Sequence, residues 1–190
     1  MEDTNTFSCR ELTTANWDDL VGLFGTHGGD GGCWCMYLRS SRKDFNDNRG
    51  DGNRELFREV VGRGKPVGLL AYVGDEPVGW IAFAPREEYP RLNNFRDYKP
   101  LDDQPVWAIT CFYTAKRVRR QGVTRFLIEN AIRVAGEYGA QILEAYPSEP
   151  GEKTNDSDIY TGIYQVFIDA GFKEVARRAP TSPIVRYQIH

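Results

Sequence analysis

The sequence lacks several features that would each point to a particular class of protein. It has no apolar run of the ~18 residues that a membrane-spanning helix needs. The N-terminus carries Glu2 and Asp3 and no apolar signal region, so we expect neither secretion nor a membrane anchor. No Gly-x-x-x-x-Gly-Lys-[Ser/Thr] motif is present, which argues against a nucleotide hydrolase of the P-loop class.

Cysteine and histidine are scarce. Four cysteines in 190 residues fit free thiols in a reducing compartment, so we expect a cytoplasmic protein. Cys33 and Cys35 make a poor metal site, because only His27 lies near them in the sequence and His190 is the last residue. We therefore expect no metal.

A basic excess is also missing. The net charge of −3 argues against a general nucleic-acid binder, because such proteins usually carry a positive balance. Hydrophobic residues at 41% and charged residues at 27% are ordinary for a globular protein. The length is most simply explained by a single domain spanning residues 1–190.

Hydrophobic periodicity and turn residues predict an α/β fold with the element order β-α-α-β-β-β-α-β-α-β-β. The central sheet is expected to be mixed, mainly antiparallel and flanked by helices. Segment 39–52 reads as a surface excursion or short helical turn, and 85–105 as a long loop. The expected strands are 6–12, 67–73, 78–84, 106–114, one from 142 and two within 174–190, and the expected helices end near 24, 61, 138 and 171.

The most informative stretch is the basic turn, residues 116–125, between the strand ending at Thr114 and the following helix. It gathers five cationic side chains around Gly122. The free N–H groups of a first helical turn and the helix dipole favour an anion there, and glycine lets the backbone approach it closely. This indicates a small phosphorylated ligand, although a solvated basic helix cap is the plainer alternative.

Within this turn, Arg119-Arg120-Gln121-Gly122-Val123-Thr124 resembles the [Arg/Gln]-x-x-Gly-x-[Gly/Ala] motif of the Gcn5-related N-acetyltransferases (GNAT). The order of elements is similar to that family across nearly the whole chain. Ala170-Gly171-Phe172, before the last two strands, resembles it as well. Thr124 departs from the motif, and its hydroxyl offers a phosphate a hydrogen bond instead.

The resemblance implies the acyl-CoA N-acyltransferase fold and acetyl-CoA as co-substrate. It implies transfer of acetyl to a primary amine of a small molecule or peptide by direct attack in a ternary complex. Dimers are common in the family, so a homodimer is possible. Carried over by position, the pyrophosphate falls on the backbone amides of Arg120, Gln121, Gly122, Val123, Thr124 and Arg125, and the pantetheine on Phe112, Tyr113 and Thr114. Arg119, at the start of the motif, is expected in the cofactor site as well. Independently of the resemblance, we expect Lys116 and Arg117 to be free to meet the 3′-phosphate.

Glu144 is the first candidate for the general base. It lies among apolar residues on the strand expected next to the pantetheine, where partial burial would make it more basic. The alternative is a carboxylate paired with an arginine. Tyr146 faces the same side of a regular strand and could line the acceptor pocket.

The general acid is less defined. The family often has a tyrosine four residues before the glycine of Gly171-Phe172, but here that residue is Phe167, which has no proton to donate. Tyr164 and Tyr160, expected on one stripe of the same helix, are the candidates to replace it. They could equally be core aromatics, and the thiolate could leave without an acid.

The segment Cys33-Trp34-Cys35 is the last candidate feature. As a covalent nucleophile a cysteine here lacks an evident His or Asp partner. We expect instead that the segment forms a wall of the acceptor site, with Trp34 among the substrate-binding residues. Phe167 also keeps open a different class of function, a catalytically weak acyl-CoA-binding or regulatory module on the same fold.

Overall fold

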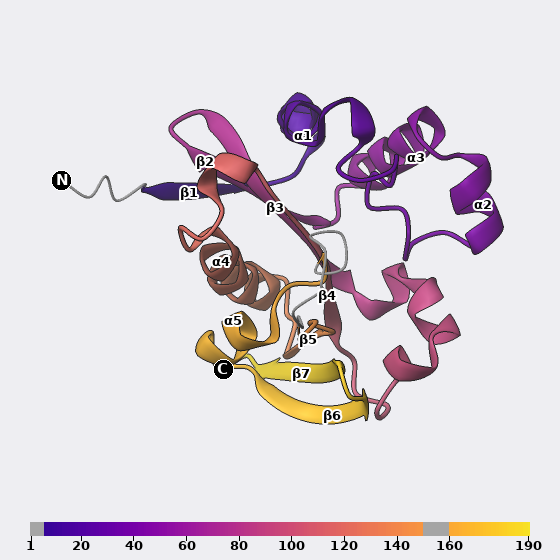
Figure 1. Cartoon of the computed structure of the whole chain (residues 1–190), viewed down its shortest axis with the longest axis vertical. Helices are drawn as coiled ribbons and strands as arrows, with labels where there is room; N and C mark the ends of the chain where they lie inside the picture. Colours follow the sequence, from indigo (N-terminus) through magenta and orange to yellow (C-terminus); the bar gives the residue numbers. More distant parts are fainter. Residues whose placement is uncertain (1–5, 150–159) are drawn as a thin grey trace.

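The computed structural model describes residues 6–149 and 160–190, and its centre is a seven-stranded sheet (Figure 1). The strand order is β1-β2-β3-β4-β5-β7-β6. All neighbouring strands are antiparallel except β4 and β5, which run parallel. The strands are β1 (Phe7–Glu11), β2 (Gly68–Val73), β3 (Glu76–Pro85), β4 (Trp107–Thr114), β5 (Ile142–Ala145), β6 (Lys173–Ala179) and β7 (Ser182–Gln188).

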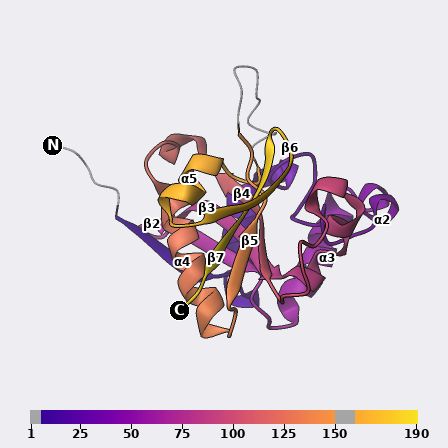
Figure 2. The ribbon, with the colours of Figure 1, turned by 90° about the horizontal axis from the view of Figure 1, so that it is seen from below.

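Helices cover both faces of the sheet (Figure 2). On one face lie α4 (Val123–Glu137) and α5 (Tyr164–Asp169). On the other lie α1 (Trp17–Phe24), α2 (Arg42–Asp47) and α3 (Asp51–Gly62) (Figure 1). Short 3-10 helices occupy Thr14–Asn16, Gly25–His27, Arg86–Glu88, Pro90–Asn94, Arg96–Tyr98 and Lys116–Val118. Among the described residues, no helix is long and apolar enough to cross a membrane.

The mixed, mainly antiparallel sheet flanked by helices is confirmed. The structure adds α2 within segment 39–52, where a short helical turn was one of the two expectations. The expected loop 85–105 contains three of the 3-10 helices. One expectation was wrong: α5 begins at Tyr164, so Tyr160 precedes the helix and the two tyrosines do not share a helical stripe. The sequence also predicts a polar loop over residues 151–157, which lie outside the described residues.

The first turn of α4 rests directly on β3. Val123 and Leu127 are buried, and both approach Gly79 on β3. A Cβ at Gly79 would lie 2.9 Å from Val123 Cγ2 and 3.2 Å from Leu127 Cδ1. The absence of a side chain at Gly79 therefore sets how closely the N-terminus of α4, and with it the basic turn, approaches the sheet.

The parallel contact between β4 and β5 is short. Trp107, Ala108 and Ile109 pair with Leu143, Glu144 and Ala145. Beyond these pairs β4 continues to Thr114, whereas β5 ends. The C-terminal half of β4 thus has β3 on one side and a break in the sheet on the other.

We expect Gly79→Ala to lower the free energy of unfolding by about 1–3 kcal/mol, because the added methyl overpacks the contact with α4. The matched control is Gly22→Ala on the exposed side of α1, where a Cβ meets nothing within 4 Å. That change should stabilise by roughly 0.5–1 kcal/mol, because alanine favours the helix. Denaturant unfolding measures both, and equal effects would contradict the close packing at Gly79.

Candidate active site

The basic turn has the backbone geometry of an anion site. Gly122 is the N-cap of α4 with φ +86°, a left-handed conformation that favours glycine. The first hydrogen bond inside α4 runs from the Phe126 N–H to the Gly122 carbonyl at 3.0 Å. The N–H groups of Val123, Thr124 and Arg125 consequently have no acceptor within the helix. Among the described residues no side chain caps this end, so these donors face outward.

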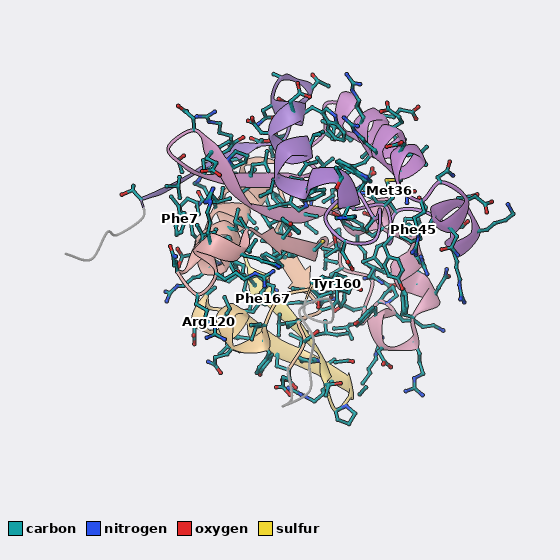
Figure 3. The ribbon with its side chains drawn as sticks, turned by 45° about the horizontal axis from the view of Figure 1, so that its top comes forward. Phe7, Met36, Phe45, Arg120, Tyr160 and Phe167 are labelled. Atoms are coloured by element: carbon teal, nitrogen blue, oxygen red, sulfur yellow. The ribbon has the colours of Figure 1, made fainter. Side chains whose placement is uncertain are left out.

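The charge of the turn is strongly positive. Arg117 pairs with Glu76, and Arg125 pairs with Glu129 at 2.9 Å. These two carboxylates offset only part of the charge of the five exposed cationic side chains within 116–125. Arg120 adopts a left-handed φ of +62° and is labelled at the edge of the molecule in Figure 3. The turn therefore combines free amides, a helix dipole and excess positive charge, which together favour a phosphate.

A short segment bridges the break between β4 and the chain after β5. The Phe112 N–H donates to the Tyr160 carbonyl at 2.6 Å, and the Ser148 N–H donates to the Gly162 carbonyl at 2.9 Å. Gly162 has φ +90°, and a Cβ there would lie 2.8 Å from the Phe167 ring. Residues 160–163 thus occupy the hydrogen-bonding position of a strand beside β4.

The three residues predicted to hold the pantetheine lie at the open end of β4. Phe112 is buried against Phe167 on the α4 side, with ring centroids 5.9 Å apart. Tyr113 points to the opposite face, where its ring meets Phe24 at 5.4 Å. Thr114 is the last residue of the strand and partly exposed. Only the backbone of β4, and not the Phe112 or Tyr113 ring, faces the break.

The two candidate acids point to different surroundings. Tyr164 contacts Glu174, which raises the pKa of its phenol, and Arg177 lies over its ring at 5.4 Å. Tyr160 instead meets Tyr37 edge-on at 6.5 Å on the other side of the sheet. Burial, followed by Tyr98 and Tyr37, raises the pKa of Tyr160, so its phenol stays protonated at neutral pH. Figure 3 shows Tyr160 near the middle of the sheet.

Phe167 lies in the core. Its side chain is fully buried, and its ring packs against Phe172 at 5.1 Å as well as against Phe112. A tyrosine hydroxyl at this position would be enclosed by phenylalanine rings. The residue at the family's usual tyrosine position therefore contributes packing here, and no proton.

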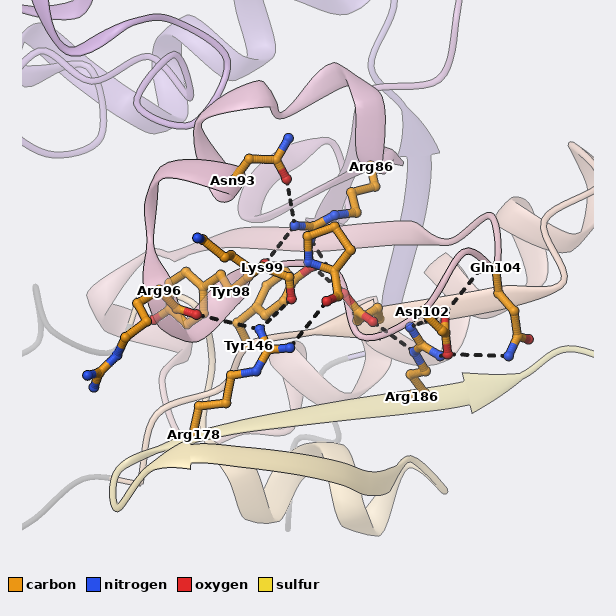
Figure 4. Close-up of polar contacts among 12 residues, drawn as sticks. Arg86, Asn93, Arg96, Tyr98, Lys99, Asp102, Gln104, Tyr146, Arg178 and Arg186 are labelled. Atoms are coloured by element: carbon orange, nitrogen blue, oxygen red, sulfur yellow. Dashed lines mark hydrogen bonds and ion pairs between the residues drawn. The ribbon is translucent and has the colours of Figure 1, made fainter.

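Glu144 is the centre of a buried ionic network (Figure 4). Its side chain is 1% exposed. Oε2 accepts from Arg186 Nε at 2.7 Å, and Oε1 lies 3.5 Å from Arg86 Nη1 and accepts from the Tyr146 hydroxyl. Arg186 also holds Asp102 in a two-pronged pair at 2.6 and 3.1 Å, which keeps the pKa of Asp102 below its ordinary value. Both carboxylate oxygens of Glu144 are thus occupied by protein donors.

The network ties the 85–105 connection to the end of the sheet. Arg86 donates to the Tyr98 carbonyl at 2.6 Å and to Asn93 at 3.1 Å. Arg178 on β6 donates to the Lys99 and Pro100 carbonyls at 2.6 and 3.2 Å. Figure 4 shows Arg178 reaching this connection from β6, whereas Arg86 lies within the connection and contacts its later residues. Their backbone contacts hold an irregular segment in place against β5, β7 and β6.

Two predicted acceptor residues expose almost no surface. Trp34 is 4% exposed and packs between Trp17 and Phe24. Tyr146 is 1% exposed, and burial, then the Glu144 charge, raises its pKa well above the ordinary value. Sequence reasoning missed a chain of partly exposed aromatic rings, in which Tyr160 contacts Tyr37, Tyr37 contacts Phe95 and Phe95 contacts Tyr98. Their residue type was the only available signal.

Two other features lie apart from the turn. A cavity of about 240 Å³ is lined by Trp107, Tyr138, Arg39 and Arg63. Trp107 begins β4 and Tyr138 follows α4, so the cavity lies at the ends of these elements away from the basic turn. Within the described residues no group of three or more His, Cys, Asp or Glu is arranged to hold a metal. The basic turn and the open end of β4 remain the region where backbone donors and charge converge.

We expect Glu144→Gln to cost about 3 kcal/mol of stability and to lower Tm by roughly 6–12 °C, because it leaves the buried Arg186 and the partly buried Arg86 without their shared carboxylate. The control is Glu137→Gln, which removes an exposed carboxylate from its pair with Arg133 and should change stability by less than about 1 kcal/mol. Calorimetry compares the two. Equal Tm values would show that Glu144 is not needed for stability and would favour its role as a base.

Comparison with known proteins gives the same picture of the fold. The PaiA N-acetyltransferase from Thermoplasma acidophilum, in complex with coenzyme A, is similar with a TM-score of 0.56 at 12% identity, over 96% of this chain and 99% of that one. The yncA structure from Salmonella typhimurium, with its cofactor acetyl-CoA, gives 0.55 at 15% identity, over 98% and 95%. An N-acetyltransferase from Staphylococcus aureus Mu50 gives 0.55 at 12% identity, over 97% and 99%.

No curated protein sequence gives a significant match to this chain. The model of the Acetyltransferase (GNAT) family, however, matches residues 34–155, which include β2 to β5, the basic turn and α4. That match covers more than half of the chain. It agrees with the strand, glycine turn and helix described above, and the chain belongs to the GNAT acetyltransferase family.

Proposed function

We propose that this protein is an N-acetyltransferase that moves acetyl from acetyl-CoA to a primary amine of a small molecule or peptide. The observation that carries the proposal is the uncapped N-terminus of α4 behind the left-handed Gly122, within a cluster of five cations. The coenzyme A and acetyl-CoA in two structurally similar proteins support it.

In this proposal the pyrophosphate binds at the basic turn. The outward N–H groups of Val123, Thr124 and Arg125 donate to its oxygens, and Arg119, Arg120 and Gln121 surround it. The Thr124 hydroxyl replaces the close approach that a glycine or alanine allows in the family motif. Lys116 and Arg117, one turn earlier, are placed for the 3′-phosphate.

The pantetheine arm then runs along the open edge of β4, past Thr114, Tyr113 and Phe112. The Phe112 N–H, however, already donates to the Tyr160 carbonyl. Donor binding therefore requires an acceptor of the pantetheine to take the place of that carbonyl, or the arm to stop short of Phe112. Residues 160–163 and the donor share the same edge of β4.

The reaction is direct attack of a neutral amine on the thioester, with the thiolate leaving. Of the two candidate acids, Tyr160 lies beside β4, whereas Tyr164 faces Glu174 and Arg177. We therefore assign the general acid to Tyr160. Glu144 stays the predicted base, but it can serve only if the amine displaces one of its arginine or tyrosine donors.

The acceptor side is the face on which Tyr37, Phe95, Tyr98 and Tyr160 gather. Asp102 pairs with Arg186, so its charge is already compensated and is not offered to a cationic acceptor. Trp34 and Tyr146 are buried, so in this proposal they support the residues that line the acceptor site and do not contact the acceptor themselves. A cytoplasmic location and a homodimer are further expectations of this proposal.

A catalytically weak acyl-CoA-binding module is the second candidate. Two observations favour it: Phe167 is enclosed in the core, and both oxygens of Glu144 are engaged. Thiol release from acetyl-CoA, measured against a panel of primary amines, separates the two functions. Turnover on any amine supports the enzyme; tight acetyl-CoA binding without turnover supports the module; and calorimetric preference for ATP over acetyl-CoA contradicts both.

We expect Arg120→Glu to weaken acetyl-CoA binding tenfold or more, about 1.4 kcal/mol, because it reverses a charge at the anion site. Arg63→Glu, an equal charge change at the exposed end of α3, is the control and should leave Kd within about twofold. Titration calorimetry measures both. The same Kd for both variants would remove the basic turn as the donor site.

We expect Tyr160→Phe to lower kcat about tenfold or more with little change in acetyl-CoA affinity, because only the phenolic proton is lost. Its raised pKa keeps the acid form present below that pKa, so the reduction should be constant from about pH 6 to pH 9. Tyr164→Phe is the control and should keep normal turnover. If both variants are fully active, the thiolate leaves without an acid.

A further inference from the structure

The cavity of about 240 Å³ lies at one end of the sheet, and the proposed acetyl transfer does not use it. Antiparallel pairing brings the start of β2, the end of β3 and the start of β4 together there, and Pro85 pairs with Trp107. Val60, near the end of α3, and Tyr138, just after α4, complete the wall. Segments far apart in the sequence therefore surround one space.

This cavity is separate from the proposed donor site. The helix α4 has 15 residues, which at about 1.5 Å per residue place its two ends roughly 22 Å apart. The basic turn precedes the N-terminal end of α4, whereas Tyr138 follows the C-terminal end. Trp107 is likewise the first residue of β4 and Thr114 the last. A donor at the basic turn and an occupant of the cavity would lie at opposite ends of the same two elements.

The wall of the cavity is largely apolar. Val60 and Val67 are buried, and two prolines extend the apolar lining. The ring centroids of Trp107 and Tyr138 lie 6.3 Å apart, and neither ring is fully buried. An apolar cavity of about 150 Å³ accommodates benzene, so one of about 240 Å³ has room for a single ring and a short side chain.

The charge around the cavity is positive. Of the described residues that line it, three are basic, Arg39, Arg63 and Lys65, and one is acidic, Glu88. Arg63 and Lys65 are exposed, whereas the Arg39 side chain is 3% exposed. The field of a buried charge is screened least by salt, so Arg39 acts most strongly on an occupant. The lining therefore favours a negative group over a neutral or cationic one.

Arg39 is incompletely paired within the protein. Its Nη2 donates to the Tyr89 hydroxyl at 3.0 Å, and its Nη1 lies 3.6 Å from the Glu88 carboxylate, which is too long for a hydrogen bond. Its Nε is buried, and no atom of the described residues accepts a hydrogen bond from it. A buried charge is costly unless it is paired and hydrogen-bonded. An anion in the adjoining cavity would supply what Arg39 lacks.

We propose that this cavity binds a small organic carboxylate whose apolar body is about the size of one aromatic ring. The carboxylate pairs with Arg39, since a guanidinium takes a carboxylate through two parallel hydrogen bonds. Glu88 is 30% exposed and turns outward to give place to it. The ring packs against Trp107 and Tyr138, so an apolar wall and a few polar groups share the recognition. The inference does not rest on the proposed acetyl transfer.

The test is titration calorimetry of the full chain with benzoate, phenylacetate and 3-phenylpropionate, without acetyl-CoA. We expect at least one acid to bind saturably at a single site. Its amide, which keeps the ring and loses the charge, should bind at least about tenfold more weakly, and so should acetate, which keeps the charge and lacks the ring. No saturable binding by any of the three acids, or equal binding of acid and amide, would overturn the proposal.

Nitrogen-15 NMR of the same titration locates the acid. The indole N–H signal of Trp107, identified by its loss in Trp107→Phe, should shift more than those of Trp17, Trp34 and Trp80, which are buried in a different cluster. A larger shift at any of those three would place the acid elsewhere. Displacement of the acid by saturating acetyl-CoA would place it at the donor site, and either result contradicts the proposal.

Variants test the charges. Arg39→Lys keeps the charge but loses the planar guanidinium, and it should weaken the acid at least about tenfold. Lys65→Glu should weaken it about fivefold or more, whereas the control Lys43→Glu, an equal change at an exposed residue of α2, should stay within about twofold. Unchanged affinity in Arg39→Lys would remove the proposed contact. If that variant fails to fold, the acid and amide titrations and the NMR shifts of the parent chain still decide.

Discussion

The parallel pairing of β4 and β5 is the constraint on which the rest of the site depends. In an otherwise antiparallel sheet, two parallel neighbours cannot be joined by a tight hairpin and need a crossover. The crossover here is the basic turn followed by α4, which returns the chain along one face of the sheet. Its helix N-terminus therefore stands at the C-terminal end of β4, where the two strands have already parted. The position of the proposed anion site and the open strand edge both follow from one topological requirement.

A second interaction supports the other side of that break. This interaction is the ionic network of two acidic residues, Glu144 and Asp102, and two basic residues, Arg86 and Arg186. Both oxygens of the buried Glu144 carboxylate accept hydrogen bonds or pair with an arginine within it. A buried charge is tolerated only when it is paired in this way. The network fixes the irregular 85–105 connection, whose Phe95 and Tyr98 rings shape the face where we place the acceptor. Its stability and the position of that face are thereby linked.

The region around Phe112 is where structural and functional demands compete. Its N–H is satisfied by Tyr160, and its ring closes the core with Phe167. The proposed donor arm and the segment 160–163 thus meet at the same few residues of β4, and a change in one is expected to affect the other.

Local chemistry in the sequence determined the elements with strong patterns. The alternating and apolar strands, the glycine of the basic turn and the family motif each depend on neighbours within a few residues, and all are found in the structure. The sequence does not decide whether Glu144 is free or paired, because its partners Arg86 and Arg186 are 58 and 42 residues away along the chain. The contact of Cys35 with Trp80 and the bridge from Tyr160 to Phe112 were equally invisible. Sequence alone determined the strand, basic turn and helix at which we propose that an anion binds; only the tertiary structure, by pairing residues distant in the chain, decided which polar groups are already occupied and which can act.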